Sequence, residues 1–458
     1  MNRRTTILLA LLAALCLRAA PLALPSFTDP DHYYHLRIAE TIISANAFPS
    51  YDSLSYLGRP HTYYPLFHIL ISIPAFLTGM SAFHAYAAIS MLTALAGVLS
   101  ISLLARKAFG KDAGVYALAF AALLPAAVIR SSGVARPDAL SILLLPLLAI
   151  SLLEGRRAPL ALLGFLLPLL HPLTALFACG VVAAKFLADL SFNRMQLRPA
   201  AWFGIPLLAG AAYYLRFPLA QLRSAGTFLT SSEMQPYNFE FALLAFGIAW
   251  LFVAFAALRR SPSVASRLLW LWLAGSSALM LLASRASVFA VAPASVLAAA
   301  GLQSALSKGF ARPAVLSLFA LGLSLAAFSF LSDLGPQYRP QTLSAAQWLG
   351  ENGGGRAAAS FWDKGHLLTY SGVPAYMDGY FEFAPDLDAR QQRATLLFQS
   401  PSRAAVGSIA GSGVRYVFAD GKMDELSGGT LPFRAYAQRS PEVAREFDAG
   451  WAQIYAVD

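Results

Sequence analysis

The residues of this chain that could do chemistry are gathered in short polar clusters within a strongly apolar sequence. The first cluster, DPDHYYHLR at 29–37, contains Asp31, His35 and Arg37. Asp31 and His35 could ligate a hard cation or accept protons. Tyrosine and histidine also favour a membrane interface, so a belt of interfacial side chains is the alternative. The second cluster, RSSGVARPD at 130–138, ends in Asp138 directly before an apolar run, where this carboxylate could instead cap a helix N-terminus.

Three further clusters follow along the chain. Glu233 lies in TSSEMQP at 230–236, where a lone acid would ordinarily be solvated, and Arg285 lies between two apolar runs. Arg285 could extend toward lipid headgroups, or it could hold an anionic lipid group with its planar fork of donors. The stretch FWDKG at 361–365 is followed directly by His366 and, taken alone, indicates only a turn that buries Trp362.

Apolar runs long enough to cross a membrane fill most of the sequence before residue 333. Charged residues make up 13% of the chain, hydrophobic residues 57%, and the mean hydropathy is +0.56. A bilayer core needs about 20 apolar residues per helix. The apolar stretch 65–80 carries His68 and Pro74, so we expect it to lie at the interface or to re-enter rather than cross. The eleven expected spans are 7–25, 85–105, 114–130, 139–153, 156–172, 173–191, 200–217, 241–258, 268–284, 286–305 and 313–331.

The loops between these runs separate by charge. Lys and Arg favour cytoplasmic loops, and alternate counting from a cytoplasmic N-terminus places the basic loops on one side. Asp31, Asp138 and Glu233 fall on the other side, together with everything after residue 332. Ionisable groups are costly in a membrane and therefore mark functional sites. The sequence predicts a multi-pass cell-membrane protein, with 7–25 retained as an anchor and the C-terminal part outside the cytoplasm.

The composition changes at about residue 332. Residues 1–332 carry a net charge of +13, whereas 333–458 carry −3 and contain no spanning run. We expect a transmembrane catalytic domain over 1–332, with a long first outer loop at 26–84, and a soluble α/β domain over 333–458. The basic loops have no interleaved stacking aromatics, so they do not indicate nucleic-acid binding. The two cysteines lie in expected spans, which argues against a disulfide framework.

In their order along the chain, these clusters resemble the catalytic subunit family of oligosaccharyltransferase, and most of all its archaeal single-subunit branch, within the GT-C glycosyltransferase superfamily. Asp31 followed by Arg37 resembles the first-loop motif of the family. The stretch ending in Asp138 resembles its second-loop motif, an Asp-x-acid pair. The stretch ending in Glu233 resembles TIxE, and 361–365 resembles WWDYG.

The resemblance implies a multispanning α-helical fold and a specific reaction. A glycan would pass from a lipid-linked donor, a dolichyl phosphate or pyrophosphate, to the Asn of an Asn-x-Ser/Thr sequon in an acceptor polypeptide. Asp31 and Glu233 would hold the acceptor amide as catalytic carboxylates. The same two residues and Asp138 would bind Mn²⁺ or Mg²⁺ beside the leaving group.

The resemblance also assigns the binding roles. Arg285 would hold the lipid phosphate, with Arg37 as an auxiliary group near the carboxylates. Phe361, Trp362 and Asp363 would bind the hydroxyl of the sequon Ser or Thr. A peptide without that hydroxyl would leave a buried acceptor unpaired. The expected partners are the lipid-linked donor, the acceptor polypeptide and membrane lipids, while the single-subunit branch implies no further subunit.

The chain departs from the family pattern at three positions. Leu140 stands where the second acid of the Asp-x-acid pair would be, so one metal ligand is missing unless His35 or His366 replaces it. Phe361 replaces the first Trp of WWDYG, and Lys364 replaces its Tyr. These departures keep a catalytically inactive relative in view.

Two further functions are alternatives to peptide glycosylation. The first is a GT-C enzyme that moves sugar from a polyprenyl phosphate to a lipid or polymer acceptor, which the lone Asp138 favours. The second is a transporter of lipid-linked sugar, which would put polar residues near the bilayer midplane rather than in outer loops. The FWDKG stretch favours the peptide acceptor, because it has no obvious use without one.

Overall fold

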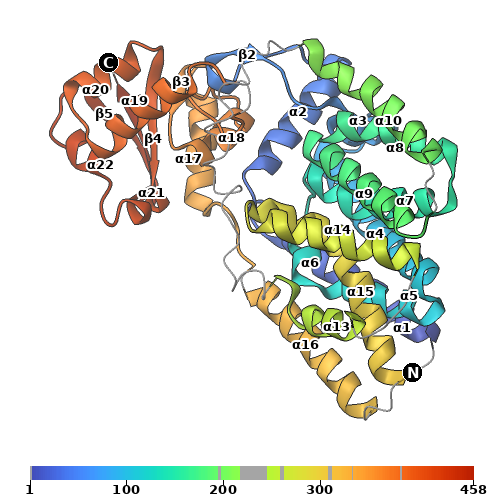
Figure 1. Ribbon diagram of the computed structural model, residues 1–458. Helices are drawn as coiled ribbons and strands as arrows, with labels where there is room; N and C mark the ends of the chain where they lie inside the picture. The colour runs from blue at the N-terminus through green and yellow to red at the C-terminus, as the bar shows by residue number, and fades with distance from the viewer. Residues whose placement is uncertain are drawn as a thin grey trace.

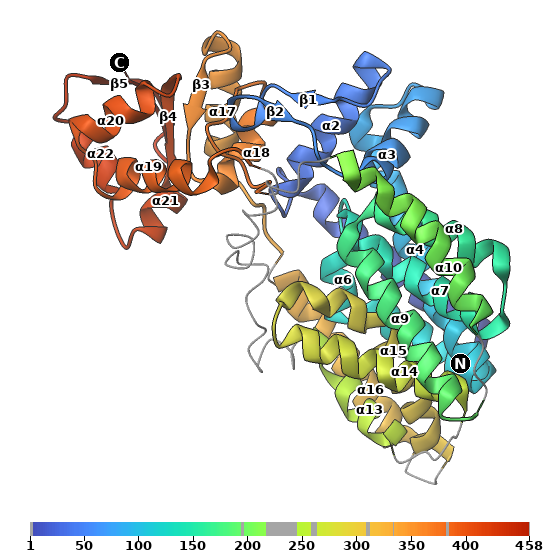
Figure 2. The same cartoon turned by 45° about the horizontal axis from the view of Figure 1, so that its top comes forward.

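The protein is described by a computed structural model over residues 3–193, 197–216, 245–257, 263–307, 312–332, 334–381 and 384–457. The side chains of Arg285 and Trp362 also lie outside this description. Figures 1 and 2 show a large bundle of helices with a smaller α/β domain beyond one end of it, next to helix α2 (Asp31–Ala45).

Each of the eleven predicted spans contains helix in the described part of the chain. Six stretches are long and apolar enough to cross a membrane by length and composition, or seven if the bent pair α5 and α6 counts as one span. Eleven spans therefore stays a prediction. The bundle contains α1 (Arg3–Ala19), η1 (Ala20–Ala23), α3 (Pro65–Thr78), α4 (Ala82–Phe109), α5 (Lys111–Leu123), α6 (Pro125–Ser131), η3 (Pro137–Leu140), α7 (Ser141–Glu154), α8 (Arg157–Leu170), α9 (Pro172–Leu190), α10 (Arg198–Ala211), η4 (Ala212–Arg216), α13 (Ile248–Ala257), α14 (Val264–Met280), η7 (Ser284–Ala286), α15 (Ser287–Ser307) and α16 (Arg312–Ser332).

Helix α15 forms the centre of the bundle. Its apolar residues do not gather on one face, and nearly all of them are buried against α13, α5, α14 and α4. Small residues let these helices approach closely, as is usual between membrane helices. A Cβ atom at Gly301 would lie only 1.7 Å from the carbonyl oxygen of Phe252 on α13, so this contact requires glycine.

A sharp bend between α5 and α6 is stabilised by a buried arginine from α1. The two helices meet at an angle of 58°, and Pro125 begins α6. A break of this kind frees backbone carbonyls that a membrane cannot hydrate. Arg18 donates to the carbonyl oxygens of Ala122 (2.8 Å) and Ala121 (3.0 Å) and to the hydroxyl of Ser131 (2.8 Å). The arginine inside the first apolar run therefore has a structural role at the bend.

The C-terminal part is a four-stranded mixed sheet with helices packed on it. The strand order is β3-β4-β6-β5, with β3 parallel to β4 and the other two pairs antiparallel. The central strand β4 is buried at six of its seven positions, so it carries cores on both faces. The elements are α17 (Pro340–Asn352), β3 (Ala357–Ala359), α18 (Trp362–Tyr370), α19 (Leu387–Gln399), α20 (Arg403–Ala410), β4 (Val414–Asp420), α21 (Gly421–Leu426), α22 (Pro432–Ala437), β5 (Val443–Asp448) and β6 (Ala452–Val457).

The segment 46–64 joins α2 to this α/β domain. It contains a hairpin of two short antiparallel strands, β1 (Tyr51–Asp52) and β2 (Arg59–Pro60), and the short helix η2 (Ser55–Leu57) between them. Backbone hydrogen bonds run from Leu57 N–H to the Ala375 carbonyl (3.1 Å) and from Ala375 N–H to the Leu54 carbonyl (2.8 Å). The segment therefore pairs with the backbone of the α/β domain at Ala375.

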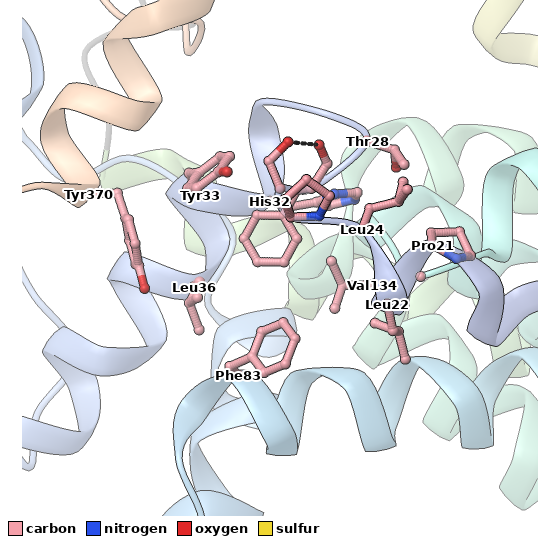
Figure 3. A pocket seen from close by; sticks show the side chains of 14 residues that line it. Pro21, Leu22, Leu24, Thr28, His32, Tyr33, Leu36, Phe83, Val134 and Tyr370 are labelled. Atoms are coloured by element: carbon pink, nitrogen blue, oxygen red, sulfur yellow. Dashed lines mark hydrogen bonds between the residues drawn. The ribbon is translucent and has the colours of Figure 1, made fainter. Parts of the chain in front are cut away.

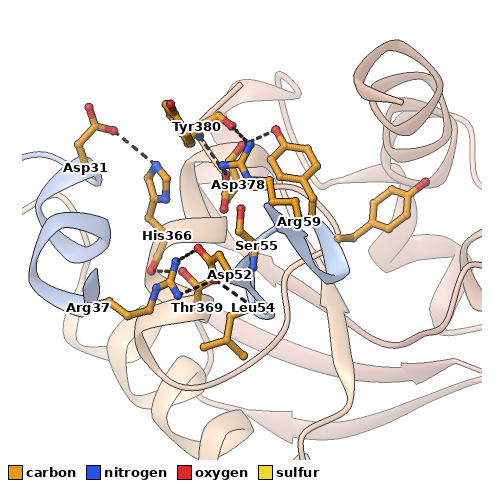
Figure 4. Close-up of polar contacts among 12 residues, drawn as sticks. Asp31, Arg37, Asp52, Leu54, Ser55, Arg59, His366, Thr369, Asp378 and Tyr380 are labelled. Atoms are coloured by element: carbon orange, nitrogen blue, oxygen red, sulfur yellow. Dashed lines mark hydrogen bonds and ion pairs between the residues drawn. The ribbon is translucent and has the colours of Figure 1, made fainter. Parts of the chain in front are cut away.

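Buried charges strengthen this junction (Figure 4). Arg37 of α2 makes a bidentate pair with Asp52, at 2.8 and 2.6 Å. Arg59 donates to the carbonyl oxygen of Tyr380 (2.8 Å) and lies 3.7 Å from the carboxylate of Asp378. Since both arginines are almost fully buried, the domain is fixed against α2, which brings α18 beside the start of that helix.

Candidate active site

Three carboxylates surround one guanidinium where α2 begins. Arg136 reaches Asp29 at 3.1 Å and Asp31 at 3.4 Å through one terminal nitrogen, and Asp138 at 3.8 Å through Nε. Asp29 and Asp31 are each 30% exposed, whereas Asp138 is buried. The first sequence cluster ends at residue 37, and the second begins 93 positions later, at residue 130. The two clusters thus meet at one place in the fold.

Helix α4 holds the loop that carries this arginine. The N–H of Ala135 donates to the hydroxyl of Ser90 (2.8 Å), and its carbonyl oxygen accepts from the hydroxyl of Tyr86 (2.7 Å). After the arginine, Pro137 opens η3, and Asp138 lies inside that short helix rather than at the N-cap of α7, which is Leu140. The helix-cap reading of Asp138 is therefore not what the structure shows.

The surroundings of Asp31 favour its ionised form. Burial alone would raise the pKa of this carboxyl, but the hydrogen bond and charge of His366 and the charge of Arg136 together bring the pKa well below its ordinary value. The Nε2 atom of His366 lies 3.5 Å from the carboxylate (Figure 4). The α/β domain thus contributes a side chain to the acidic cluster of the bundle.

A cavity of about 370 Å³ is lined by one of the three acids, Asp29, and by Arg136. Its polar wall contains Asp29, His32, Arg130 and Arg136, while its other wall is apolar and comes mainly from α6 and the end of α16, including Phe330. Such a cavity suits an amphipathic ligand with an anionic head and an apolar tail.

His32 is a candidate site residue that the sequence reasoning did not single out. It lines the first cavity and also a neighbouring one of about 250 Å³. Figure 3 shows Tyr33 and Leu36 of α2 on one side of this second cavity and Leu22 and Leu24 on the other. Burial lowers the pKa of His32, which keeps its imidazole neutral near pH 7. Its place next to Asp31 in the first cluster was the available signal.

The auxiliary residues predicted near the acids divide between two locations. His366 joins Asp31, as described. His35 instead lies 3.0 Å from His68 of α3, ring nitrogen to ring nitrogen, in the interior between α2 and α3. Arg37 pairs with Asp52 and belongs to the junction with the α/β domain.

Several predicted site residues lie outside the description. Glu233 is not among the described residues, so its relation to Asp31 stays a prediction. The side chains of Arg285 and Trp362 are likewise not described, although their backbones lie in η7 and at the start of α18. The catalytic, phosphate and sequon roles of these three residues remain predictions.

The described residues of the FWDKG stretch face the interior of the α/β domain. Phe361 packs edge-on against Phe398, with ring centroids 5.1 Å apart. The Nζ atom of Lys364, fully buried, lies 2.7 Å from Asp363 and 3.6 Å from Asp420. One oxygen of Asp363, Oδ1, is buried without a hydrogen-bond partner in the described structure.

The described residues do not fit a divalent cation. Carboxylate oxygens are suitable ligands for Mn²⁺ or Mg²⁺. However, Asp29, Asp31 and Asp138 all face Arg136, and no group of three or more His, Cys, Asp or Glu side chains is arranged to hold a metal in the described part of the chain. Leu140, at the position of the missing acid, packs into an apolar cluster with Leu36 and other residues of α2 to α4.

Solved structures with the same fold include an archaeal oligosaccharyltransferase and ArnT. The archaeal oligosaccharyltransferase AglB from Archaeoglobus fulgidus, in complex with an inhibitory peptide and a dolichol-phosphate, matches with a TM-score of 0.69 and 16% identity over 100% of this chain and 74% of that chain. The same enzyme with Zn and sulfate matches with a TM-score of 0.67 and 16% identity over 99% and 73%. ArnT from Cupriavidus metallidurans bound to undecaprenyl phosphate matches with a TM-score of 0.62 and 12% identity over 99% and 97%.

These likenesses define the class of fold. The chain has the fold of AglB and ArnT, which here consists mostly of helices, several of them apolar, with a small sheet domain at its C-terminus, as the sequence predicted. Together with the apolar helices, this fold makes it a membrane protein. Within that class, the chain is similar in fold to AglB over its whole length. No protein-family model matches the sequence, and no curated protein matches it either.

Proposed function

We propose that this chain is a membrane glycosyltransferase that takes a sugar from a lipid phosphate or pyrophosphate and transfers it to the Asn of an Asn-x-Ser/Thr sequon. The observation that carries the proposal is the cavity in which Asp29, Arg130 and Arg136 face an apolar wall ending at α16. An isoprenoid phosphate has the same division into a charged head and an apolar tail. The shared fold with AglB and ArnT supports the same donor class.

The transfer requires one bond to break and one to form. The bond between the anomeric carbon of the sugar and the phosphate oxygen breaks, and its electron pair stays with the phosphate. The acceptor nitrogen forms the new bond to the same carbon and gives up one proton to a carboxylate. Asp31 can take this role, because its lowered pKa keeps it ionised, and the nitrogen becomes acidic enough for a weak base once it bonds to the sugar carbon. Glu233 is the second carboxylate that the motif resemblance proposes for the amide.

The charge that develops on the leaving phosphate would be met by arginines. Arg130 and Arg136 both line the cavity, and a guanidinium presents a planar pair of donors that matches phosphate oxygens. Fixed donors of this kind stabilise a developing anion without reorganising. Arg285 remains a proposed third contact. Mn²⁺ or Mg²⁺ stays a prediction of the resemblance, and no step of the proposed reaction depends on it.

The peptide acceptor is supported by the place of the α/β domain. This domain brings His366 to Asp31, so an acceptor bound to the domain would lie close to the carboxylate. Trp362 and Asp363 remain the proposed contacts for the sequon hydroxyl, with the unpaired Oδ1 of Asp363 as the acceptor atom. The proposed orientation places this domain and the acidic cluster outside the cytoplasm.

A lipid or polymer acceptor is the second candidate. The specific observation in its favour is the ion pair of Asp363 with the buried Lys364, which engages one carboxylate oxygen and leaves only the other for a sequon hydroxyl. ArnT shares the fold over 97% of its own length, although at 13% identity in its apo structure.

Mass spectrometry of a sequon peptide distinguishes the two acceptors. The purified protein would be incubated with a native lipid extract, Mn²⁺ and either a peptide containing Asn-x-Thr or the same peptide with Gln for Asn. Peptide glycosylation requires a mass increase on the first peptide alone. Sugar transfer only to lipids of the extract would support the second candidate, and no transfer to any acceptor would contradict the proposed function.

A further inference from the structure

Arg136 stands at the centre of the acidic cluster, where a cation is needed. Its guanidinium lies 3.1 Å from Asp29, 3.4 Å from Asp31 and 3.8 Å from Asp138. These carboxylates come from the start of α2 and from η3, two elements that are distant in sequence. Without a positive charge between them, three acids at this spacing would repel one another.

The backbone on both sides of Arg136 is fixed. Both polar groups of Ala135 are hydrogen-bonded to side chains of α4, and the N–H of Ala139 donates to the carbonyl oxygen of Arg136 at 3.0 Å. The arginine side chain is only 10% exposed. The guanidinium is therefore built into the site before any ligand arrives.

A divalent cation would compete with this arginine for the same oxygens. Mn²⁺ and Mg²⁺ bind carboxylate oxygens at about 2.1 Å, so an ion shared by Asp31 and Asp138 would be placed against the guanidinium and would meet like charge. Leu140, at the position of the missing acid, is apolar and buried, so this position supplies no oxygen donor to a metal.

We infer that Arg136 takes the place of a divalent cation in this chain, and that the acidic cluster carries its positive charge as a side chain. Its task during transfer, offsetting charge on the leaving phosphate, rests on the proposed function. Its occupancy of the metal position does not, because that part concerns only which cation the carboxylates bind. Arg136 lines the donor cavity as well as the acidic cluster, so one group serves both.

Mn²⁺ binding by the full-length protein in detergent tests the inference directly. Electron paramagnetic resonance would follow free Mn²⁺ during titration of the wild type, Asp138→Asn, Arg136→Gln, Arg136→Gln with Asp138→Asn, and the exposed control Arg356→Gln. The wild type and the control are expected to show no saturable site that depends on Asp138. Removal of the guanidinium frees the three carboxylates. R136Q is therefore expected to gain one saturable Mn²⁺ site and to bind Mn²⁺ at least about tenfold more tightly than the wild type does. Asp138→Asn should abolish that site again.

Two results would overturn the inference. One is a saturable Mn²⁺ site in the wild type that Asp138→Asn removes, and this arm decides even if R136Q does not fold. The other is R136Q that folds normally, judged by its thermal unfolding, and binds Mn²⁺ no better than the wild type. Sugar transfer is the separate readout for the proposed function. Wild-type transfer should survive chelation by EDTA, and a protein with the expected Mn²⁺ behaviour but no transfer would refute the function alone.

Discussion

Asp31 keeps its negative charge because His366 and Arg136 stand beside it. Burial by itself would raise the pKa of this carboxyl, and the two basic neighbours more than offset that increase. His366 comes from the α/β domain, so the ionisation of a bundle residue depends on a residue more than 300 positions later in the chain. A carboxylate that must accept a proton at the right moment is tuned by such neighbours.

Replacing His366 should shift the pH dependence of transfer. In His366→Ala the hydrogen bond and charge that lower the pKa of Asp31 are lost, so Asp31 will protonate at higher pH. The acidic limb of the pH–rate profile should therefore move to higher pH, while the rate near pH 7 should change by less than about tenfold, because Arg136 still keeps Asp31 ionised there. His84→Ala, at an exposed histidine of α4, is the matched control and should leave the profile unchanged. A rate loss without any movement of the acidic limb would mean that His366 has only a structural role.

At the scale of elements, two junctions determine where the site residues stand. Arg18 holds the bend between α5 and α6, and its own carbonyl accepts the N–H of Gly133 (2.6 Å), which begins the loop leading to Arg136. Arg37 fastens α2 to Asp52 through a buried bidentate pair. These arginines belong to the support of the site rather than to the acidic cluster.

Arg18→Met should destabilise the bundle by about 1–3 kcal/mol, because the carbonyls of Ala121 and Ala122 would be left without a donor in an apolar environment. Thermal unfolding in detergent micelles measures the effect. Arg4→Met, at an exposed arginine of the same helix, should change the midpoint little. Equal midpoints for the two variants would contradict the role given to Arg18.

The Arg37–Asp52 pair should make stability depend on acid pH. Burial alone would raise the pKa of Asp52, but the hydrogen bond and charge of Arg37 lower it below its ordinary value of 3.8. The folded state therefore binds this proton more weakly than the unfolded state, and the pair stabilises the protein fully above that value. The stability difference between the wild type and Asp52→Asn should be constant near neutral pH and shrink as the pH falls below about 3.8. A difference that grows in acid would have the wrong sign.

The sequence predicted the elements better than their contacts. Every predicted span contains helix, because a long run of apolar residues indicates a buried or lipid-facing segment, and such a segment forms a helix to satisfy its backbone hydrogen bonds. Asp31, Asp138 and Glu233 were predicted to bind one ion together. Asp31 and Asp138 do share Arg136 as a partner, since each lies in the first turn of its helix, whereas Glu233 is outside the described residues. The position of Arg136 between the two aspartates was not predicted, because spacing along the chain does not say which charge will be central. Arg18 gave no signal for its partners, which are backbone carbonyls and therefore invisible in residue types.

At the scale of the whole molecule, the α/β domain and the bundle form one site only while they stay joined. The segment 46–64 makes backbone hydrogen bonds to the domain at Leu54 and Leu57, and Arg59 adds a buried ion pair with Asp378. Figure 2 shows the domain next to α2 and apart from most of the bundle, so this junction carries much of the attachment.

Arg59→Leu should loosen that attachment. It leaves Asp378 as a buried charge without its arginine partner, a change that usually costs about 3–5 kcal/mol. Hydrogen exchange should become faster at Leu57 and Ala375, whose backbone hydrogen bonds cross the junction, while exchange in β4 should stay slow. Arg356→Leu, at an exposed arginine of the domain, is the control. Unchanged protection at Leu57 in Arg59→Leu would show that the ion pair is not needed for docking.

The central claim is that sugar leaves a lipid phosphate at the site of Asp31 and Arg136. The most direct measurement is the amount of lipid-linked sugar left in a native lipid extract after incubation with purified protein and a mixture of sequon peptide and lipid acceptors. The wild type is expected to consume the donor, and Asp31→Asn to consume it at least about 100-fold more slowly with unchanged thermal unfolding. An intact donor pool with the wild type, or equal consumption by the two proteins, would contradict the account.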